Sequence, residues 1–316
     1  MPNLVLHIGL HKTGTTAIQT FFRNNRRQIF QKTGFDYVPV GVAAGHGHAN
    51  LAWQIRNDQR FSTCRGTWDD VFRYIQSQNV NSRFYIISSE EFDGFDFDDI
   101  KKLGKILESC NVTIVLMLRN QFDLAVAMHK QNMKRFMMPD LANWLEKVKQ
   151  GYRFNFDELV RNWEMLGSNH AINILPYERV SENLIGNFAC QAGIPQEILS
   201  YLPKYNLLKN TSLSYSFFNA YQALIKEYDD AGKRENFLLK RKKILQNAEK
   251  NGYNKFDGIP VSDYDACAFM KSFYEGNKFI HDCFVKLPKE YFNPPQPAPF
   301  ENQEITSEEI EQLSRP

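Results

Sequence analysis

Apolar runs that suit β-strands alternate with amphipathic segments along the first 180 residues of the chain. The predicted strands lie at 4–8, 84–88, 112–118 and 172–178. After the first of them, Ile18, Phe21 and Phe22 recur at the spacing of one helix face. The third run is continuously apolar, which is typical of a strand buried on both faces of a parallel sheet. The pattern therefore predicts an α/β fold with a central parallel sheet.

Beyond Pro176 the apolar pattern becomes helical. Apolar residues keep helical spacing at 183–192 and 214–228, and a charged helix is expected at 236–252. The basic run inside that helix, Lys240–Lys243, is interpreted as a solvated helix face. We therefore expect the second part of the chain to be mainly helical.

These patterns predict one domain over residues 1–292, whose C-terminal part, from about 180 to 292, is helical. Residues 293–316 are rich in Pro and then acidic. Such a composition favours an extended or loosely docked tail. The expected organisation is thus a single domain followed by a tail.

A loop rich in Gly, Lys and Thr joins the first predicted strand to the first predicted helix. Gly9 and Gly14 permit tight backbone turns, and the amides at Thr13–Thr16 point at the start of the helix, where the helix dipole favours negative charge. Lys12 adds a full positive charge. The segment therefore predicts an anion-binding loop held between two rigid elements.

A nucleoside triphosphate is the first ligand to consider for such a loop. The Walker A sequence, however, places Lys directly after its second Gly, whereas Lys12 precedes Gly14. Neither the run at 84–88, which leads into Ser-Ser-Glu-Glu, nor the run at 112–118, which leads into Arg119, ends in a Walker B Asp. Binding of ATP or GTP is therefore disfavoured.

Arg119 directly follows the continuous apolar run and precedes a segment of helical pattern, in which Asn120 suits the N-cap and Asp123 the first turn. The residue thus falls at the carboxyl end of a predicted parallel strand. Open α/β sheets bind ligands at that edge. Arg119 is therefore a candidate ligand-binding cation.

The run His-Ile-Gly-Leu-His-Lys-Thr-Gly-Thr-Thr at 7–16 resembles the 5′-phosphosulfate loop of sulfotransferases that use 3′-phosphoadenosine 5′-phosphosulfate (PAPS), in the form common among bacterial members. Further segments follow in the order of that family, at 45–52, 84–91, 172–178 and 210–214. The resemblance covers roughly residues 3 to 285. It implies a P-loop-like, three-layer α/β fold and a PAPS-dependent sulfotransferase.

The resemblance assigns roles within the loop. Lys12 would stabilise the bridging oxygen of PAPS as it becomes a leaving anion. The cofactor-binding set of the loop would be His11, Lys12, Thr13, Gly14, Thr15 and Thr16, with amides and hydroxyls of the threonines on the 5′-phosphate. Sulfuryl transfer would proceed by in-line displacement to a hydroxyl of a carbohydrate or other small metabolite, and the family requires no metal.

The resemblance also assigns Arg119 to the 3′-phosphate of the nucleotide. The family places a Ser eight residues later on the following helix, and this chain has Ala127 there. One hydroxyl donor to the phosphate is therefore missing. Gln131 and Lys134, one and two turns further along the same predicted helix face, are the candidates to replace it.

The catalytic base has two leading candidates. Glu90 lies just past a predicted strand end, where the cytosolic enzymes of this family carry their base, and Glu91 is its neighbour. His48 and His46 lie on the loop after the first helix, and an unperturbed His already has a pKa near the operating pH. Position therefore favours Glu90, chemistry favours His48, and the other two remain alternatives.

Composition narrows the remaining possibilities. A net charge of +2 gives no reason to expect nucleic-acid binding, and five scattered cysteines predict reduced thiols. No leader and no run of about 18 apolar residues is present, so we expect a soluble, cytoplasmic protein without a membrane span. The acceptor and the oligomeric state are not specified. The alternatives are a catalytically silent nucleotide-binding protein of the same fold and a P-loop kinase-like phosphotransferase.

Overall fold

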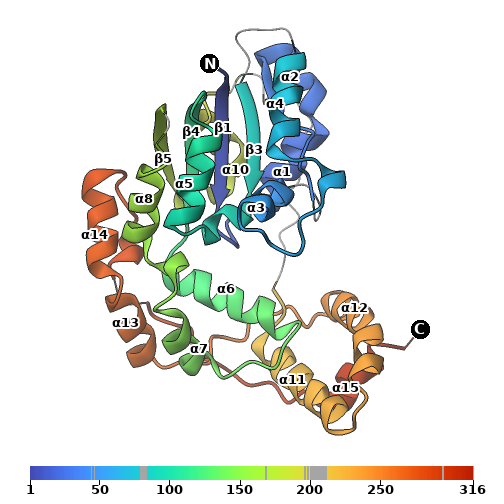
Figure 1. The fold of residues 1–316 in the computed structure, drawn as a ribbon. Helices are drawn as coiled ribbons and strands as arrows, with labels where there is room; N and C mark the ends of the chain where they lie inside the picture. Colours follow the sequence, from blue (N-terminus) through green and yellow to red (C-terminus); the bar gives the residue numbers. More distant parts are fainter. Residues whose placement is uncertain are drawn as a thin grey trace. The chain divides into compact units, whose positions relative to one another are not determined.

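The computed structural model describes residues 1–43, 45, 47–78, 84–167, 169–195, 197, 199, 212–293 and 295–315. Among these residues, five parallel strands form one sheet in the order β2-β3-β1-β4-β5 (Figure 1). The strands are β1 (Asn3–Gly9), β2 (Phe35–Tyr37), β3 (Phe84–Ser89), β4 (Asn111–Leu118) and β5 (Asn169–Pro176). The predicted α/β fold with a central parallel sheet is confirmed.

Both faces of the sheet are buried, as the continuous apolar runs indicate. On one face, Val5 of β1 packs in a cluster with Phe22 of α1 (Thr15–Asn24) and Phe188 of α10 (Leu184–Gln191). Leu4 and Leu6 alternate with Val5 and therefore point to the opposite face, where each is at most 2% exposed. Helices cover both faces in Figure 1, which gives three layers.

The contacts within the described chain divide it into two compact units. The first comprises Met1–Asn120, Gly151–Leu207 and Phe273–Tyr291, and it contains the whole sheet. Its other α-helices are α2 (Arg26–Thr33), α3 (Ala49–Ile55), α4 (Trp68–Ser77), α5 (Phe97–Ile106), α8 (Phe156–Glu164), α9 (Tyr177–Val180) and α14 (Tyr274–Cys283). Its 3-10 helices are η1 (Thr63–Arg65), η2 (Glu90–Gly94), η3 (Tyr152–Phe154), η4 (Ser181–Asn183) and η6 (Lys289–Tyr291).

The second unit comprises Gln121–Gln150, Leu208–Ser272 and Phe292–Pro316, and the regular structure of its described residues is helical. The helices are α6 (Gln121–Met133), α7 (Leu141–Val148), α11 (Tyr215–Asp230), α12 (Arg234–Lys250), α13 (Asp263–Lys271) and α15 (Ser307–Gln312). The helical character of the C-terminal part was predicted. Each unit is built from three separate segments of the chain, and the single domain expected at 1–292 stays a prediction.

The C-terminal tail departs from the extended or loosely docked segment predicted for it. Residues 307–312 form α15, which packs against α11 and buries Ile310 completely. Glu311 accepts a hydrogen bond from Lys240 at 2.8 Å, and Thr306 and Glu309 form a capping box at the start of the helix. An apolar contact, an ion pair and a cap thus hold the acidic segment in place.

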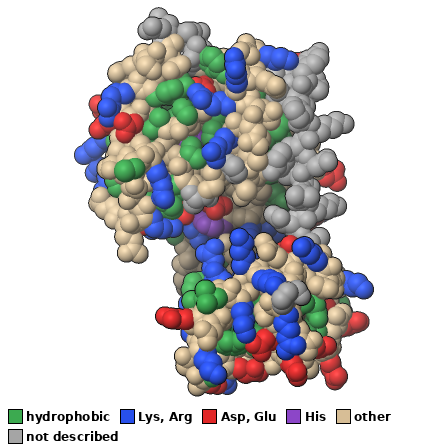
Figure 2. Space-filling model, turned by 90° about the vertical axis from the view of Figure 1, so that its right-hand side faces the viewer, with side chains coloured by type: hydrophobic (Ala, Val, Ile, Leu, Met, Phe, Trp, Pro, Cys, Tyr) green, Lys and Arg blue, Asp and Glu red, His purple; other side chains and the backbone are tan. Residues whose placement is uncertain are grey.

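Lys and Arg side chains are interspersed with Asp and Glu on the face drawn in Figure 2, in keeping with the small net charge. Lys240, from the basic run of α12, forms an ion pair with Glu311. Within the described part of the chain, the helices are all too short or too polar to cross a lipid bilayer.

Candidate functional site

The loop between β1 and α1 is a tight turn built on two left-handed residues. Lys12 has φ 68° and Gly14 has φ 78°, a conformation that costs a side-chain-bearing residue energy. A Cβ on Gly14 would also lie 2.5 Å from Cδ2 of Leu184, so the position admits only glycine without a shift. The turn between β1 and α1 is therefore strained at Lys12, and the crowding gives a physical reason for glycine at position 14.

Thr13 holds the loop together from within. Its side chain is fully buried, and its amide and hydroxyl both donate to the Leu10 carbonyl, at 3.3 and 2.6 Å. Both groups, which were expected to bind the anion, are therefore used inside the loop. The start of α1 still presents the amides at Thr15 and Thr16, because the first turn of a helix lacks intrahelical acceptors for its N–H groups. The Thr16 side chain is exposed beside them.

Arg119 reaches the same loop from the end of β4. Its Nη1 donates to the Lys12 carbonyl at 2.7 Å, and its guanidinium lies 5.3 Å from the centre of the Tyr177 ring. The strand order explains this meeting, since β1 and β4 are neighbours and both end at this edge. Sequence reasoning placed Arg119 at the ligand-binding edge but gave no sign that it would support the loop backbone.

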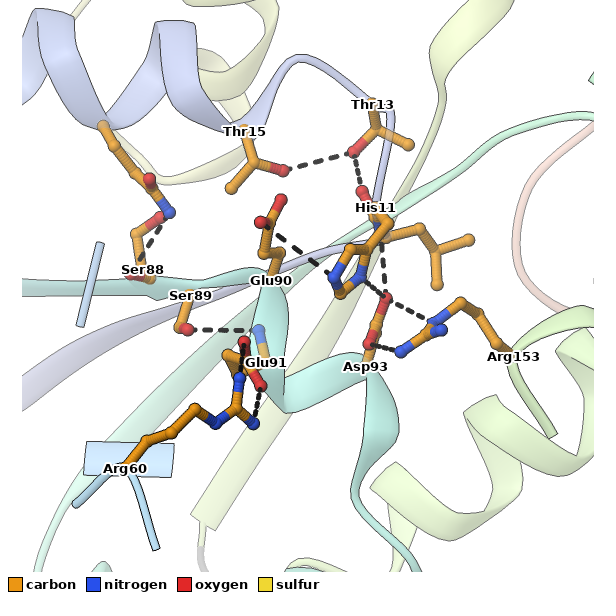
Figure 3. A network of polar contacts seen from close by, with 12 residues as sticks. His11, Thr13, Thr15, Arg60, Ser88, Ser89, Glu90, Glu91, Asp93 and Arg153 are labelled. Carbon is orange, nitrogen blue, oxygen red and sulfur yellow. Dashed lines mark hydrogen bonds and ion pairs between the residues drawn. The ribbon is translucent and has the colours of Figure 1, made fainter. Parts of the chain in front are cut away.

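His11 anchors the other side of the loop to a buried carboxylate, as Figure 3 shows. Asp93 Oδ2 lies 2.7 Å from His11 Nδ1 and also accepts the His11 backbone N–H at 3.1 Å. Arg153 binds both Asp93 oxygens, at 2.8 and 2.7 Å. Sequence reasoning missed Asp93 and Arg153, because the second lies 60 residues further along the chain and belongs to no recognisable motif.

The charges in this group favour a protonated His11. Burial alone would lower the pKa of His11, but the charge and hydrogen bond of Asp93 outweigh it and raise that pKa above its usual value. Burial would raise the pKa of Asp93, but His11 and Arg153 hold it below its usual value. An ionised Asp93 between two cations is therefore the stable arrangement.

Glu90 and Glu91, the carboxylates after β3, have different surroundings. Both Glu91 oxygens bind Arg60, each at 3.2 Å, so Glu91 is part of a surface ion pair. Glu90 begins η2, its side chain is 42% exposed, and its Oε1 lies 4.0 Å from His11 Nε2. Figure 3 shows Glu90 pointing toward the loop and Glu91 pointing toward Arg60. Glu90 is therefore the better placed of the two for chemistry at the loop.

His48 is part of the core of the first unit. The ring is fully buried, Nε2 lies 2.7 Å from the Val38 carbonyl, and Nδ1 accepts the Ser88 N–H at 3.0 Å. Burial lowers the pKa of His48 to about 4. Both ring nitrogens are engaged with the backbone, so we do not include His48 among the proposed catalytic groups. The other loop histidine, His46, lies outside the described residues.

Gln131 lies on α6, in the second unit, as does Ala127 at the position where the family carries Ser. The rest of the candidate site, from His11 to Thr16 with Glu90 and Arg119, lies in the first unit. A role for Gln131 at the nucleotide therefore stays a prediction. No cluster of three or more His, Cys, Asp or Glu suited to a metal ion occurs among the described residues.

No protein-family model matches the sequence, and no curated protein does either. Among solved structures, the chain is similar to the crystal structure of a sulfotransferase from Alicyclobacillus acidocaldarius. The two are 13% identical, the match covers 75% of this chain and 95% of that chain, and the TM-score is 0.42. Similarity this distant does not assign an activity, which has to be argued from the site itself.

Proposed function

We propose that this chain is a sulfotransferase that transfers a sulfuryl group from PAPS to a hydroxyl of a carbohydrate or other small metabolite. The observation that carries the proposal is the loop at the start of α1, where Lys12 precedes a left-handed Gly14 and Arg119 supports the turn from β4. The start of a helix with a Lys and an Arg beside it suits an anionic ligand. The order of Lys and Gly departs from the Walker A loop, which disfavours a nucleoside triphosphate, and it resembles the phosphosulfate loop of PAPS-dependent sulfotransferases.

Side chains and backbone amides of the loop have different parts in the proposed reaction. Lys12 neutralises the charge that develops on the bridging oxygen when the bond from sulfur to the 5′-phosphate breaks. The amides of Thr15 and Thr16 bind the 5′-phosphate, and Thr13 keeps the loop in shape through its bonds to Leu10. Because sulfuryl transfer resembles phosphoryl transfer, positioning and charge neutralisation supply most of the rate acceleration.

Glu90 is the proposed base. It is exposed enough to meet an acceptor, and it lies on η2 beside the loop. His48 is buried with both ring nitrogens bonded to the backbone, and Glu91 is held by Arg60. A carboxylate that accepts the proton of the acceptor hydroxyl during transfer accelerates such a step by about 100- to 10,000-fold.

A catalytically silent nucleotide-binding protein is the second candidate. Ala127 supports this alternative, because sulfotransferases of the resembling family have at this position a Ser whose hydroxyl binds the 3′-phosphate. A hydrogen bond to a charged group contributes about 1.5–3 kcal/mol, so its loss weakens binding without abolishing it. Binding of PAPS with no turnover at all would favour this candidate.

Transfer of radioactive sulfate tests the proposal directly. The protein is incubated with ³⁵S-labelled PAPS and a panel of sugars, phenols and alcohols, with γ-³²P-labelled ATP and magnesium in parallel. We expect ³⁵S to appear in at least one hydroxyl compound, together with an equal amount of 3′-phosphoadenosine 5′-phosphate (PAP). Transfer from ATP and none from PAPS would overturn the assignment.

A further inference from the structure

The His11 ring is oriented so that one nitrogen faces the protein interior and the other faces Glu90. Asp93 is fully buried and ionised, so it can only accept hydrogen bonds, and Nδ1 of His11 must donate to it across 2.7 Å. Nε2 is then the ring atom that points toward Glu90 Oε1 (Figure 3). The His11 and Glu90 side chains are 23% and 42% exposed, so a molecule from solvent can reach both.

The separation between His11 Nε2 and Glu90 Oε1 suits an oxygen atom that is hydrogen-bonded to both. His11 Nε2 and Glu90 Oε1 are 4.0 Å apart, too far for a direct hydrogen bond. An oxygen atom about 2.8 Å from each of them fits between or beside them, because two such distances exceed the separation. A hydroxyl in this place can donate a hydrogen bond to Glu90 and accept one from His11 Nε2.

We propose that His11 and Glu90 form a two-point clamp for the acceptor hydroxyl, with His11 held in place by Asp93. This inference rests on the proposed sulfotransferase function and gives His11 a different role from the cofactor binding implied by the sequence. Glu90 takes the proton of the acceptor O–H as one lone pair of that oxygen forms the new bond to sulfur. The bond from sulfur to the bridging oxygen breaks, and its electron pair leaves with the 5′-phosphate, beside Lys12.

The charged groups around His11 stabilise its imidazole in the protonated form, which is the form that the clamp needs. The groups facing His11 are Asp93 and Glu90, which favour the charge, and Arg153, which opposes it. The balance raises the pKa of His11, so Nε2 keeps its proton to a higher pH than an unperturbed imidazole would. Above that pKa the remaining proton stays on Nδ1, bound to Asp93, and Nε2 no longer donates. Turnover should therefore fall as the pH rises through the pKa of His11.

The same geometry discriminates between hydroxyl and amine acceptors. A hydroxyl oxygen has two lone pairs, so one can accept a hydrogen bond from His11 while the other attacks sulfur. A neutral amine has a single lone pair, which it cannot use for both. The clamp therefore selects an alcohol or a sugar hydroxyl.

Three substitutions of His11 and one control separate the clamp from a structural role. His11→Asn places an amide near the position of Nδ1 and so keeps a hydrogen-bond partner for Asp93. His11→Gln places an amide near the position of Nε2. His11→Ala removes the groups at both positions. His170→Gln, on the far end of β5, is the matched control. The readouts are hydrolysis of PAPS with water as the acceptor, affinity for PAP by calorimetry, and the titration of His11 in the wild type by NMR.

The clamp predicts that Asn and Ala at position 11 lower PAPS hydrolysis by about 10- to 100-fold, that Gln retains more of it, and that PAP affinity stays within about 3-fold of the wild type. The NMR titration should show a pKa above about 6.5. A fully active His11→Asn, or a loss of PAP affinity as large as the loss of turnover, would overturn the clamp alone. A wild-type protein that neither binds PAP nor hydrolyses PAPS would overturn the proposed function, and the clamp with it.

Discussion

The guanidinium of Arg119 donates a hydrogen bond to the backbone carbonyl of Lys12 at 2.7 Å. This contact joins the end of β4 to the loop after β1, two segments that are 107 residues apart in the sequence. It also opposes the cost of the left-handed conformation of Lys12. A nucleotide bound at the loop would therefore contact both the Arg119 guanidinium and the backbone turn at Lys12, which this hydrogen bond holds together.

Replacing Arg119 by Ala tests whether it binds the 3′-phosphate or only supports the loop. We expect Arg119→Ala to weaken PAP binding by more than about 10-fold, because a charged hydrogen bond is lost. Binding of adenosine 5′-phosphosulfate, which lacks the 3′-phosphate, should change much less. Calorimetry with both nucleotides checks this. Equal losses for the two would leave Arg119 as a support of the loop and remove it from the 3′-phosphate.

Lys12 should be needed for turnover and not for folding. Lys12→Ala should lower turnover by on the order of 100- to 1,000-fold, because the charge on the leaving oxygen is no longer neutralised. Lys12→Gly is the matched control, since glycine adopts φ 68° without strain and removes the same charge. Thermal unfolding should show both variants folded. A fully active Lys12→Gly would exclude the proposed role.

Glu90 and His48 should respond to substitution in opposite ways. Glu90→Gln should lower turnover by about 100- to 10,000-fold and leave the unfolding free energy nearly unchanged, because the side chain is exposed. His48→Ala should lower the unfolding free energy by about 2 kcal/mol or more, because it leaves the Val38 carbonyl and the Ser88 amide buried without partners. Urea unfolding and initial rates, measured on the same preparations, separate the two effects. Near-normal turnover in Glu90→Gln would place the base elsewhere.

The ion pair of His11 with Asp93 should make stability depend on pH in a defined direction. The folded pKa of His11 lies above its unfolded value, so its stabilisation is complete below about pH 6.5 and is lost as the pH rises through the folded pKa. His11→Asn keeps a partner for Asp93 but does not titrate. The stability deficit of this variant relative to the wild type, from urea unfolding, should therefore be larger at about pH 5.5 than at about pH 9. A deficit that does not change with pH would contradict the charged pair.

The sequence allowed the sheet and the loop to be predicted because both follow from local patterns. The apolar runs became β1, β3, β4 and β5, and the Gly and Lys pattern became the turn before α1. The strand Phe35–Tyr37 is too short to show a period, and it was not predicted. Helix α15 was missed although its capping box, Thr306 with Glu309, is visible in the sequence, because the acidic composition suggested an exposed tail.

The candidate site was harder to predict, since it depends on contacts between distant segments. Nothing local indicates that Arg153 would fix Asp93, or that Asp93 would fix the ring of His11. His48 looked like a loop histidine with a suitable pKa, but its burial changes both its pKa and its partners. Sequence patterns show which residue types are present along the chain, whereas burial and partnership arise only when the chain folds.

Binding of PAP in the absence of metal tests the central claim most directly. The wild-type protein is unfolded by heat or urea in EDTA, with and without PAP, and with ATP and magnesium in a separate series. At 100 times its dissociation constant, PAP should raise the unfolding free energy by about 2.7 kcal/mol. ATP with magnesium should add much less. Stabilisation by ATP and magnesium, with none by PAP, would contradict the assignment of this loop to a phosphosulfate nucleotide.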